Sequence, residues 1–246
     1  MILAAGLGTR LRPLTDSRPK ALVEIGGRTL LEITLSRLRE FGVGEVIVNV
    51  HHFADMVTSY LKANNNFGMR IEVSREDERL LDTGGGLKKA AWFFLQDSRE
   101  EPFLLHNVDV VSTIDLGCMV EFHRQHKALA TLAVQKRESS RYLLFDDRLA
   151  LCGRRVSRDK EELAGTSSAT HALAFTGIHV ISPRLLRLMK EEGVFSIIDF
   201  YLHLAKAGER ILAFGADEYY WRDLGRPENV KRAAEELEQQ GLIANG

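Results

Sequence analysis

Strand-like and helix-like segments alternate through the first half of the chain, and this alternation limits the possible folds more than any other feature. Short apolar segments typical of strands stand at residues 1–5, 45–50, 70–74, 102–111 and 129–136. Segments with a helical spacing of apolar residues stand between them, at 29–41, 53–64, 86–97 and 116–128. Strands separated by helices predict an α/β fold with a mostly parallel sheet, because parallel neighbours need a long crossover. Ligands of such sheets bind at the carboxyl ends of the strands.

The second half of the chain is less regular. A hairpin is predicted within 142–156, with its turn at Asp146 and Asp147, and the charged, then small and polar segment 158–171 predicts a loop. Strands are expected at 172–182, 210–217 and 218–225, and helices at 183–193, 196–209 and 227–240. Neither a repeat nor a low-complexity linker divides the sequence, which predicts one domain over residues 1–246.

Charge and composition exclude several classes of partner. The net charge of −1 over 246 residues provides no general attraction to nucleic acid or to an acidic membrane surface. The longest apolar runs, such as 90–95, fall far short of the roughly 18–20 residues of a membrane helix. The start MILAA has no basic leader and is too short for a signal peptide. Cys118 and Cys152 fit no metal-binding spacing, which favours two reduced thiols in a cytoplasmic protein.

The first candidate site is the segment AAGLGTRLRP at residues 4–13. Its glycines suggest a dinucleotide motif or a phosphate-binding P-loop, but both motifs need glycine at the position of Leu11. The missing dinucleotide motif argues against a nicotinamide-dependent oxidoreductase. Glycines can still turn backbone N–H groups inward to bind an anion, and Arg10 and Lys20 add positive charge. The alternative is a solvated basic loop after a strand.

Three further segments have residues suited to phosphate and metal chemistry. The sequence LLDTGGGLKKA (80–90) places three glycines before a predicted helix, where exposed N–H groups can donate to a base or phosphate. A flexible loop with a helix cap at Thr83 has the same pattern. The strand in LLHNVDVV (104–111) ends at Asn107 and Asp109, and YYWRDLGRPENV (219–230) contains Asp223. Carboxylates at such positions can hold Mg²⁺, or they can simply form turns.

Together these four segments closely resemble the sugar-1-phosphate nucleotidyltransferases, the NDP-sugar pyrophosphorylases. The motifs occur in that family's order along essentially the whole chain, and the TGGG segment and short length are most similar to N-acetylmuramate-1-phosphate uridylyltransferases and bacterial mannose-1-phosphate guanylyltransferases. The resemblance implies a Rossmann-like, mostly parallel mixed sheet flanked by helices, with a nucleotide-binding half at 1–136 and a sugar-binding half at 137–246. It implies transfer of a nucleotidyl group from an NTP to a sugar-1-phosphate, with release of pyrophosphate, by a monomer or small homo-oligomer.

The resemblance also implies a role for each matching residue. Contacts to the nucleotide are implied for Ala5, Gly6, Gly8, Thr9, Arg10, Lys20, Thr83, Gly84 and Gly85. Asn107 and Gly177 match positions that face the sugar, and Asp109 and Asp223 match the pair that holds Mg²⁺. Arg10, Lys20 and Asp109 are the catalytic candidates, because the reaction needs aligned and neutralised phosphates rather than a side-chain nucleophile.

Two departures from the family pattern leave alternatives open. Val108 precedes Asp109 where the family usually has glycine, and valine would be strained if that position needs a positive φ. A lysine that binds the sugar phosphate in many members has no counterpart here, and Arg154 or Arg155 is the expected substitute. A nucleotide-sugar-binding regulator with weak or no activity is therefore the alternative function. If Val108 only crowds the site, the Val108→Gly variant is expected to keep the reaction rate or to raise it.

Overall fold

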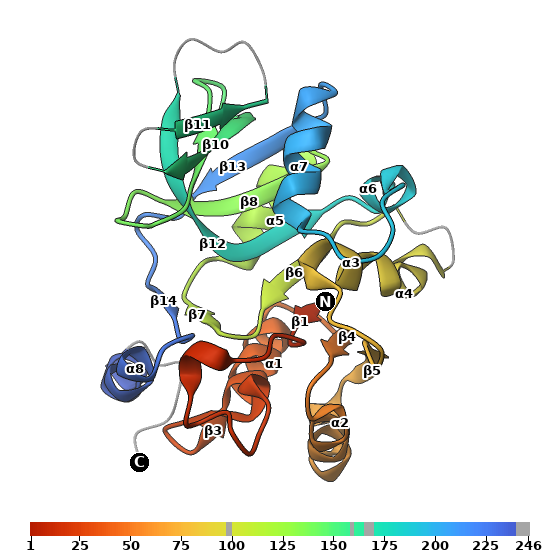
Figure 1. Cartoon of the computed structure of the whole chain (residues 1–246), viewed down its shortest axis with the longest axis vertical. Coiled ribbons are helices and arrows are strands. Elements are labelled where there is room, and N and C mark those ends of the chain that lie inside the picture. Colours follow the sequence, from red (N-terminus) through yellow and green to blue (C-terminus); the bar gives the residue numbers. More distant parts are fainter. Residues whose placement is uncertain (97–99, 158–159, 165–169, 240–246) are drawn as a thin grey trace. The chain divides into compact units, whose positions relative to one another are not determined.

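The computed structural model describes residues 1–96, 100–157, 160–164 and 170–239 (Figure 1). The described residues form two compact units that interleave along the chain. Unit 1 comprises those within Met1–Leu81, His106–Ile114 and Tyr219–Gly246, and unit 2 comprises those within Asp82–Leu105 and Asp115–Glu218. Each unit therefore takes residues from both sides of position 136.

Unit 1 contains the parallel part of the sheet. Its strands are β1 (Ile2–Leu3), β4 (Glu45–Val50), β5 (Arg70–Arg75) and the last two residues of β6 (Phe103–Asn107), in the order β6-β1-β4-β5. All these pairings are parallel, with Ile2 opposite both Val48 and His106. Two antiparallel pairs complete the strands of unit 1: β2 (Glu24–Ile25) with β3 (Arg28–Thr29), and β7 (Val110–Ser112) with β14 (Trp221–Asp223).

The helices of unit 1 are α1 (Leu30–Glu40), α2 (Ala54–Ala63) and α8 (Pro227–Gln239), with short 3₁₀ turns η1 (Thr9–Leu11), η2 (Lys20–Leu22) and η3 (Asn65–Gly68). Helix α1 begins where the Thr29 side chain accepts a hydrogen bond from the Glu32 N–H, 3.1 Å away. Its residues Leu31, Leu35 and Leu38 are buried, as the helical spacing predicts.

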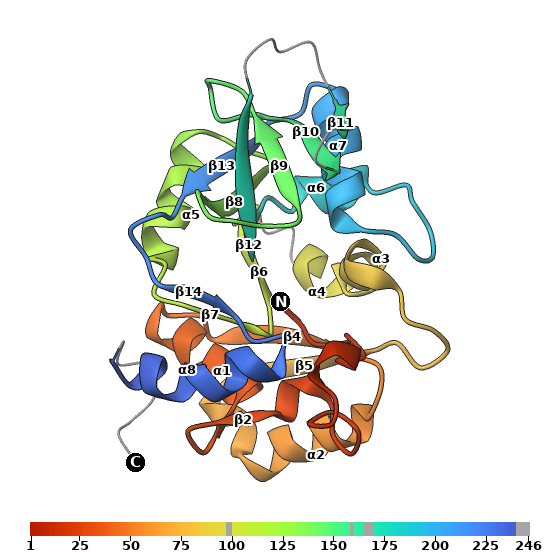
Figure 2. The same ribbon diagram turned by 60° about the vertical axis from the view of Figure 1, so that its left-hand side comes forward.

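Unit 2 contains the mixed part of the sheet, in which β12 lies beside β8 and β9 and β8 lies beside β13 (Figure 2). Only β13 on β8 is parallel among the pairings recorded for these strands. The strands are the first residues of β6, then β8 (Ala130–Gln135), β9 (Tyr142–Phe145), β10 (Leu151–Ser157), β11 (Lys160–Leu163), β12 (His171–Ile181) and β13 (Ile211–Gly215). The helices are α3 (Asp82–Lys89), α4 (Ala91–Leu95), α5 (Leu116–Gln125), α6 (Arg184–Leu188) and α7 (Ile197–Lys206).

The predicted α/β class, with a mixed sheet flanked by helices, is confirmed, and so is the β9–β10 hairpin, in which Leu151 pairs with Phe145. Two local predictions are wrong. The helix expected at 86–97 begins at Asp82, so the three glycines lie inside α3 and not in a loop before it. Part of the loop expected at 158–171 is strand β11, because a strand pairing with β10 satisfies its backbone groups. Residues 158–159 and 165–169 of that loop lie outside the described residues.

Neither cysteine in the described chain forms a disulfide; Cys118 is exposed and Cys152 is buried. None of the described helices is long and apolar enough to span a membrane.

Candidate active site

The segment after β1 is a bent loop with N–H groups available to a ligand. Gly6 is exposed, and Gly8 has a φ of 66°, a conformation that glycine adopts without strain. The carbonyl of Gly8 accepts the Thr15 hydroxyl at 2.8 Å, which holds the bend. Within the described chain, the N–H groups of Gly6, Leu7 and Gly8 donate to no recorded protein acceptor. Successive free N–H groups in such a bend form an anion-binding concavity.

Leu11 explains why this loop lacks the third glycine of a dinucleotide motif. Its side chain is fully buried, and its N–H donates to the Gly8 carbonyl at 2.8 Å. The buried Leu11 side chain therefore fixes the end of the 3₁₀ turn η1, and Thr9 and Arg10 remain exposed on that turn.

Strand pairing brings the two predicted metal aspartates together. Strand β14 lies antiparallel to β7 with Asp223 opposite Val110, the residue after Asp109. The Leu224 N–H donates to the Asp109 carbonyl at 2.8 Å, which extends the pairing past both aspartates. Two carboxylates from distant parts of the sequence thus meet at one strand end in unit 1.

Gly225 marks the point where the charged groups converge. A methyl group built on Gly225 would lie 2.7 Å from Asp223 Oδ1, 3.2 Å from Asp109 Oδ2 and 3.1 Å from Arg10 Nη2. The ammonium of Lys20 donates to Asp109 Oδ2, and both side chains are 13% exposed. Arg10, Lys20, Asp109 and Asp223 therefore form one cluster in unit 1.

This cluster fits a divalent cation in its donor chemistry and in its space. Mg²⁺ prefers oxygen ligands, and it commonly takes one or two carboxylates and completes its shell with water and substrate phosphates. Asp109 and Asp223 supply two such oxygens beside the space that a side chain at Gly225 would fill. No group of three or more His, Cys, Asp or Glu side chains suited to a metal occurs among the described residues.

The three glycines of the TGGG segment lie in helix α3 of unit 2, and all three are buried. The N–H groups of Gly84 and Gly85 donate to the Phe195 carbonyl, at 2.9 and 3.2 Å. The Thr83 hydroxyl accepts the Ile197 N–H at 3.0 Å. The expectation that these glycines expose their N–H groups to a ligand is therefore wrong for Gly84 and Gly85, because the Phe195 carbonyl already accepts both N–H groups.

The two positions expected to face the sugar lie at strand irregularities. Asn107 is half-buried at the end of β6, opposite Leu3. Gly177 is buried in β12 with a φ of 86°, between Phe175 and His179, where the pairing with β8 shifts register. The positive φ gives a reason for glycine at 177, since other residues adopt it only with strain.

Val108 proves to be a core residue. Its side chain is 2% exposed and its N–H donates to the Leu3 carbonyl at 3.1 Å. The residues with positive φ in the described chain do not include Val108, so the backbone there suits valine without strain. The burial of the Val108 side chain in the core argues against the interpretation that valine crowds the metal site.

We expect Val108→Gly to lower the free energy of unfolding by about 2–4 kcal/mol, through lost apolar burial and added backbone freedom. Urea unfolding of the wild type, Val108→Ala and Val108→Gly measures this, with alanine intermediate. Activity per folded molecule should not rise in either variant. A stable Val108→Gly protein with a higher rate would contradict the core assignment.

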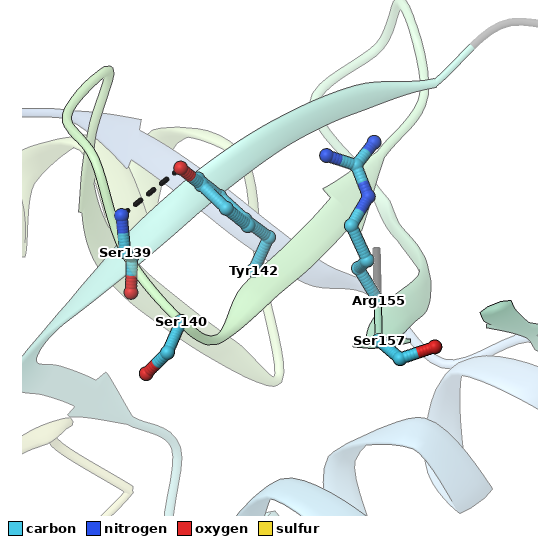
Figure 3. A pocket seen from close by; sticks show the side chains of 5 residues that line it. All are labelled: Ser139, Ser140, Tyr142, Arg155 and Ser157. Atoms are coloured by element: carbon cyan, nitrogen blue, oxygen red, sulfur yellow. Dashed lines mark hydrogen bonds between the residues drawn. The ribbon is translucent and has the colours of Figure 1, made fainter. Parts of the chain in front are cut away.

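A cavity of about 360 Å³ in unit 2 is lined by Ser139, Ser140, Tyr142, Arg155 and Ser157 (Figure 3). Tyr142 Oη accepts the Ser139 N–H at 2.9 Å, and the Arg155 guanidinium lies 5.4 Å from the centre of the Tyr142 ring. Arg155 also donates to Glu161. Arg154, the other candidate for the sugar phosphate, is held by Glu162 and Asp199 and lines a different cavity.

Gly225 and Glu76 are site-related residues that the sequence did not single out. Gly225 lies in the segment 219–230, but only the structure shows that Asp109 and Arg10 approach it so closely that a side chain there would crowd them. Glu76 lies in the charged run REDER, which is typical of a solvated surface, yet its side chain is 1% exposed.

The sequence was compared with family models and curated proteins. The nucleotidyl transferase family model matches residues 1–240. The chain belongs to the nucleotidyl transferase family. It is 35% identical to an N-acetylmuramate alpha-1-phosphate uridylyltransferase of Caulobacter vibrioides, over 96% of this chain and 94% of that protein. It is 30% identical to a probable mannose-1-phosphate guanylyltransferase of Oryza sativa subsp. japonica, over 92% of this chain but 61% of that protein.

Solved structures show the same fold at low sequence identity. HddC from Yersinia pseudotuberculosis, complexed with GMP-PN, has a TM-score of 0.75 and 22% identity, covering 96% of this chain and 97% of that one. A UDP-glucose pyrophosphorylase from Acinetobacter baumannii has a TM-score of 0.77 and 17% identity, covering 97% and 92%. As a nucleotidyl transferase family member, the chain is an enzyme that transfers a nucleotidyl group from an NTP to a sugar-1-phosphate.

Proposed function

We propose that this nucleotidyltransferase uses UTP and an N-acetylmuramate-type sugar 1-phosphate, and that it releases pyrophosphate. The observation that carries the proposal is the cluster of Arg10, Lys20, Asp109 and Asp223 around Gly225. The choice of substrates rests on the Caulobacter relative, whose length this chain matches almost fully. Guanylyl transfer to mannose 1-phosphate is the second candidate, supported by the guanylyltransferase relatives.

In this proposal the loop after β1 binds the NTP phosphates. The N–H groups of Gly6 and Gly8 face the phosphate oxygens, Ala5 and Thr9 bound the loop, and Arg10 adds a bidentate donor. The ammonium of Lys20 offsets the charge that builds up when a second phosphate approaches. The attacking sugar phosphate is already ionised, so no side chain needs to remove a proton from it.

Asp109 and Asp223 would hold Mg²⁺, as their convergence at Gly225 supports. The bound ion supplies Lewis-acid activation of the α-phosphoryl group and a template for the two phosphates. Asp109 and Asp223 would hold the ion in position. Lys20 would then give up its contact with Asp109 and contact a phosphate instead. Lys20 and Asp109 would then each keep a partner of opposite charge in both states.

Nucleotide contact at Thr83, Gly84 and Gly85 is also proposed, on the family resemblance. Because Gly84 and Gly85 are buried and their N–H groups already donate to the Phe195 carbonyl, the half-buried Thr83 side chain is the proposed point of contact with the base. On the sugar side, Asn107 and Gly177 are proposed contacts, and the cavity beside Arg155 is the proposed site of the sugar phosphate.

A panel of NTPs and sugar 1-phosphates with Mg²⁺ tests the proposal by release of pyrophosphate. UTP with N-acetylmuramate 1-phosphate should give the highest kcat/KM, at least tenfold above GTP with mannose 1-phosphate. The reverse order would favour guanylyl transfer. No release with any pair, together with tight binding of an NDP-sugar, would indicate a regulator instead.

We expect Arg155→Gln to raise the KM for the sugar 1-phosphate about tenfold, because a charge-assisted phosphate contact is lost. The KM for the NTP should change less than twofold. Arg187→Gln is the matched control, since Arg187 is an exposed arginine of unit 2 that pairs only with Glu100 among its recorded contacts. An unchanged KM for the sugar 1-phosphate would remove Arg155 from the sugar site.

A further inference from the structure

A chain of buried hydrogen bonds runs under the phosphate loop in unit 1. The Ala4 N–H donates to Asn49 Oδ1 at 2.8 Å, and Asn49 Nδ2 donates to Glu76 Oε1 at 2.7 Å. The Leu81 N–H donates to Glu76 Oε2 at 2.8 Å. Asn49 is 2% exposed and Glu76 is 1% exposed, so both polar groups depend on these partners.

Glu76 is an unusual buried carboxylate. No recorded ion pair of the described chain includes it, and both of its oxygens accept N–H donors instead. Removing a carboxylate from water without a cation is costly unless hydrogen bonds replace the lost hydration. Every bond in the chain also has a fixed direction, since Glu76 only accepts and Asn49 accepts from Ala4 and donates to Glu76.

The two ends of this chain of bonds lie next to proposed nucleotide contacts in the sequence, since Ala4 precedes Ala5 and Leu81 stands two residues before Thr83. Ala4 directly precedes the loop of residues 5–10. Leu81 ends the segment 76–81, which follows β5. Strands β1, β4 and β5 are parallel neighbours, so both segments leave the sheet at its carboxyl edge. Asp109 follows β6 on the other side of β1, so the proposed metal ligand and the segment 76–81 follow strands on opposite sides of β1.

We propose that Asn49 and Glu76 are positioning residues for the nucleotide. They hold the phosphate loop and the segment 76–81 at a set separation, so that one nucleotide can contact both with its phosphates and its nucleoside. The inference rests on the proposed function and adds to it, because neither side chain is accessible enough to touch substrate.

Because each hydrogen bond has a fixed direction, the proposal can be tested by exchanging the carboxylate and the amide between positions 49 and 76. Glu76→Gln introduces an N–H₂ group that must face another donor, from either Asn49 or Leu81. Asn49→Asp places a second carboxylate against Glu76. The double variant Asn49→Asp with Glu76→Gln restores every bond, because the new carboxylate accepts from Ala4 and from the new amide, whose oxygen accepts from Leu81. Glu78→Gln, an exposed change in the same segment, is the control.

Each single variant should raise the KM for the NTP at least tenfold and leave the KM for the sugar 1-phosphate within twofold. The double variant should return the KM for the NTP to within threefold of the wild type. Single variants that lose only thermal stability and keep the KM for the NTP would overturn the proposal, and so would a folded double variant without recovery. If the singles do not fold, the double variant alone decides by its KM.

Failure of the proposed function gives a different result. A wild-type protein that binds UTP with Mg²⁺ in calorimetry but releases no pyrophosphate overturns the proposed activity. The Kd of UTP then replaces the KM in the same comparison of variants. A Kd that is unchanged in both single variants would overturn the positioning role.

Discussion

Replacing Asp109 or Asp223 with Asn is expected to lower Mg²⁺-dependent kcat by roughly 10³-fold, the scale on which loss of one preorganised charged group acts. An amide keeps the size of the carboxylate but has no negative charge and only one oxygen. The cation would then lose one of the two charges that hold it beside the space at Gly225.

The fold should survive both changes. Asp223 Oδ1 accepts the Gly225 N–H at 2.6 Å, and an amide oxygen can accept the same bond. Asp109→Asn removes the partner of Lys20, whose ammonium remains partly exposed to water. We therefore expect Asp223→Asn to change the free energy of unfolding by no more than about 1 kcal/mol. Asp109→Asn takes the counter-charge from the mostly buried Lys20 ammonium, and we expect it to cost about 3 kcal/mol.

Asp55→Asn is the matched control, because Asp55 is an exposed carboxylate of unit 1 that pairs with Arg75. Kinetics across a Mg²⁺ titration, with urea unfolding of each variant, separate metal loss from misfolding. A variant at either aspartate with near wild-type kcat would remove that residue from the proposed metal site.

Gly84→Ala is expected to destabilise unit 2 by about 3 kcal/mol, the scale of overpacking in a filled site. The added Cβ would lie 2.4 Å from two ring carbons of Phe195 and 2.9 Å from the Phe195 carbonyl oxygen. The ring cannot simply swing away with its backbone, because the Gly84 N–H donates to that same carbonyl. Helix propensity alone predicts the opposite sign, since alanine favours a helix by about 1 kcal/mol over glycine.

Gly44→Ala is the control for this change, because nothing lies within 4 Å of its Cβ position and Gly44 has no positive φ. Thermal unfolding should show a large loss for Gly84→Ala and almost none for Gly44→Ala. Adding Phe195→Ala to Gly84→Ala should cost less than the sum of the two single changes, since the ring that clashes is then gone. A Gly84→Ala protein as stable as the wild type would contradict the close approach.

Local patterns in the sequence were enough to predict most elements. Leu31, Leu35 and Leu38 recur with helical spacing, and all three are buried in α1. The prediction failed at α3, because three successive glycines are typical of a loop. In the structure they lie inside the helix, and Phe195 packs so closely against Gly84 that a larger residue would clash there. The strand β11 was missed for a related reason, since its charged residues Lys160, Glu161 and Glu162 show no apolar alternation.

The sequence by itself determined the fold class, the family and most of the residues proposed for the site, because strand–helix order and short motifs are properties of neighbouring residues. Only the tertiary structure decided how Asp109 and Asp223 meet, why Gly225 has no side chain and where Val108 lies. It also showed that Glu76, in a run of charges, is buried with Asn49 beneath the phosphate loop. Such contacts depend on strand pairing between distant segments, and no local pattern records which strands will pair.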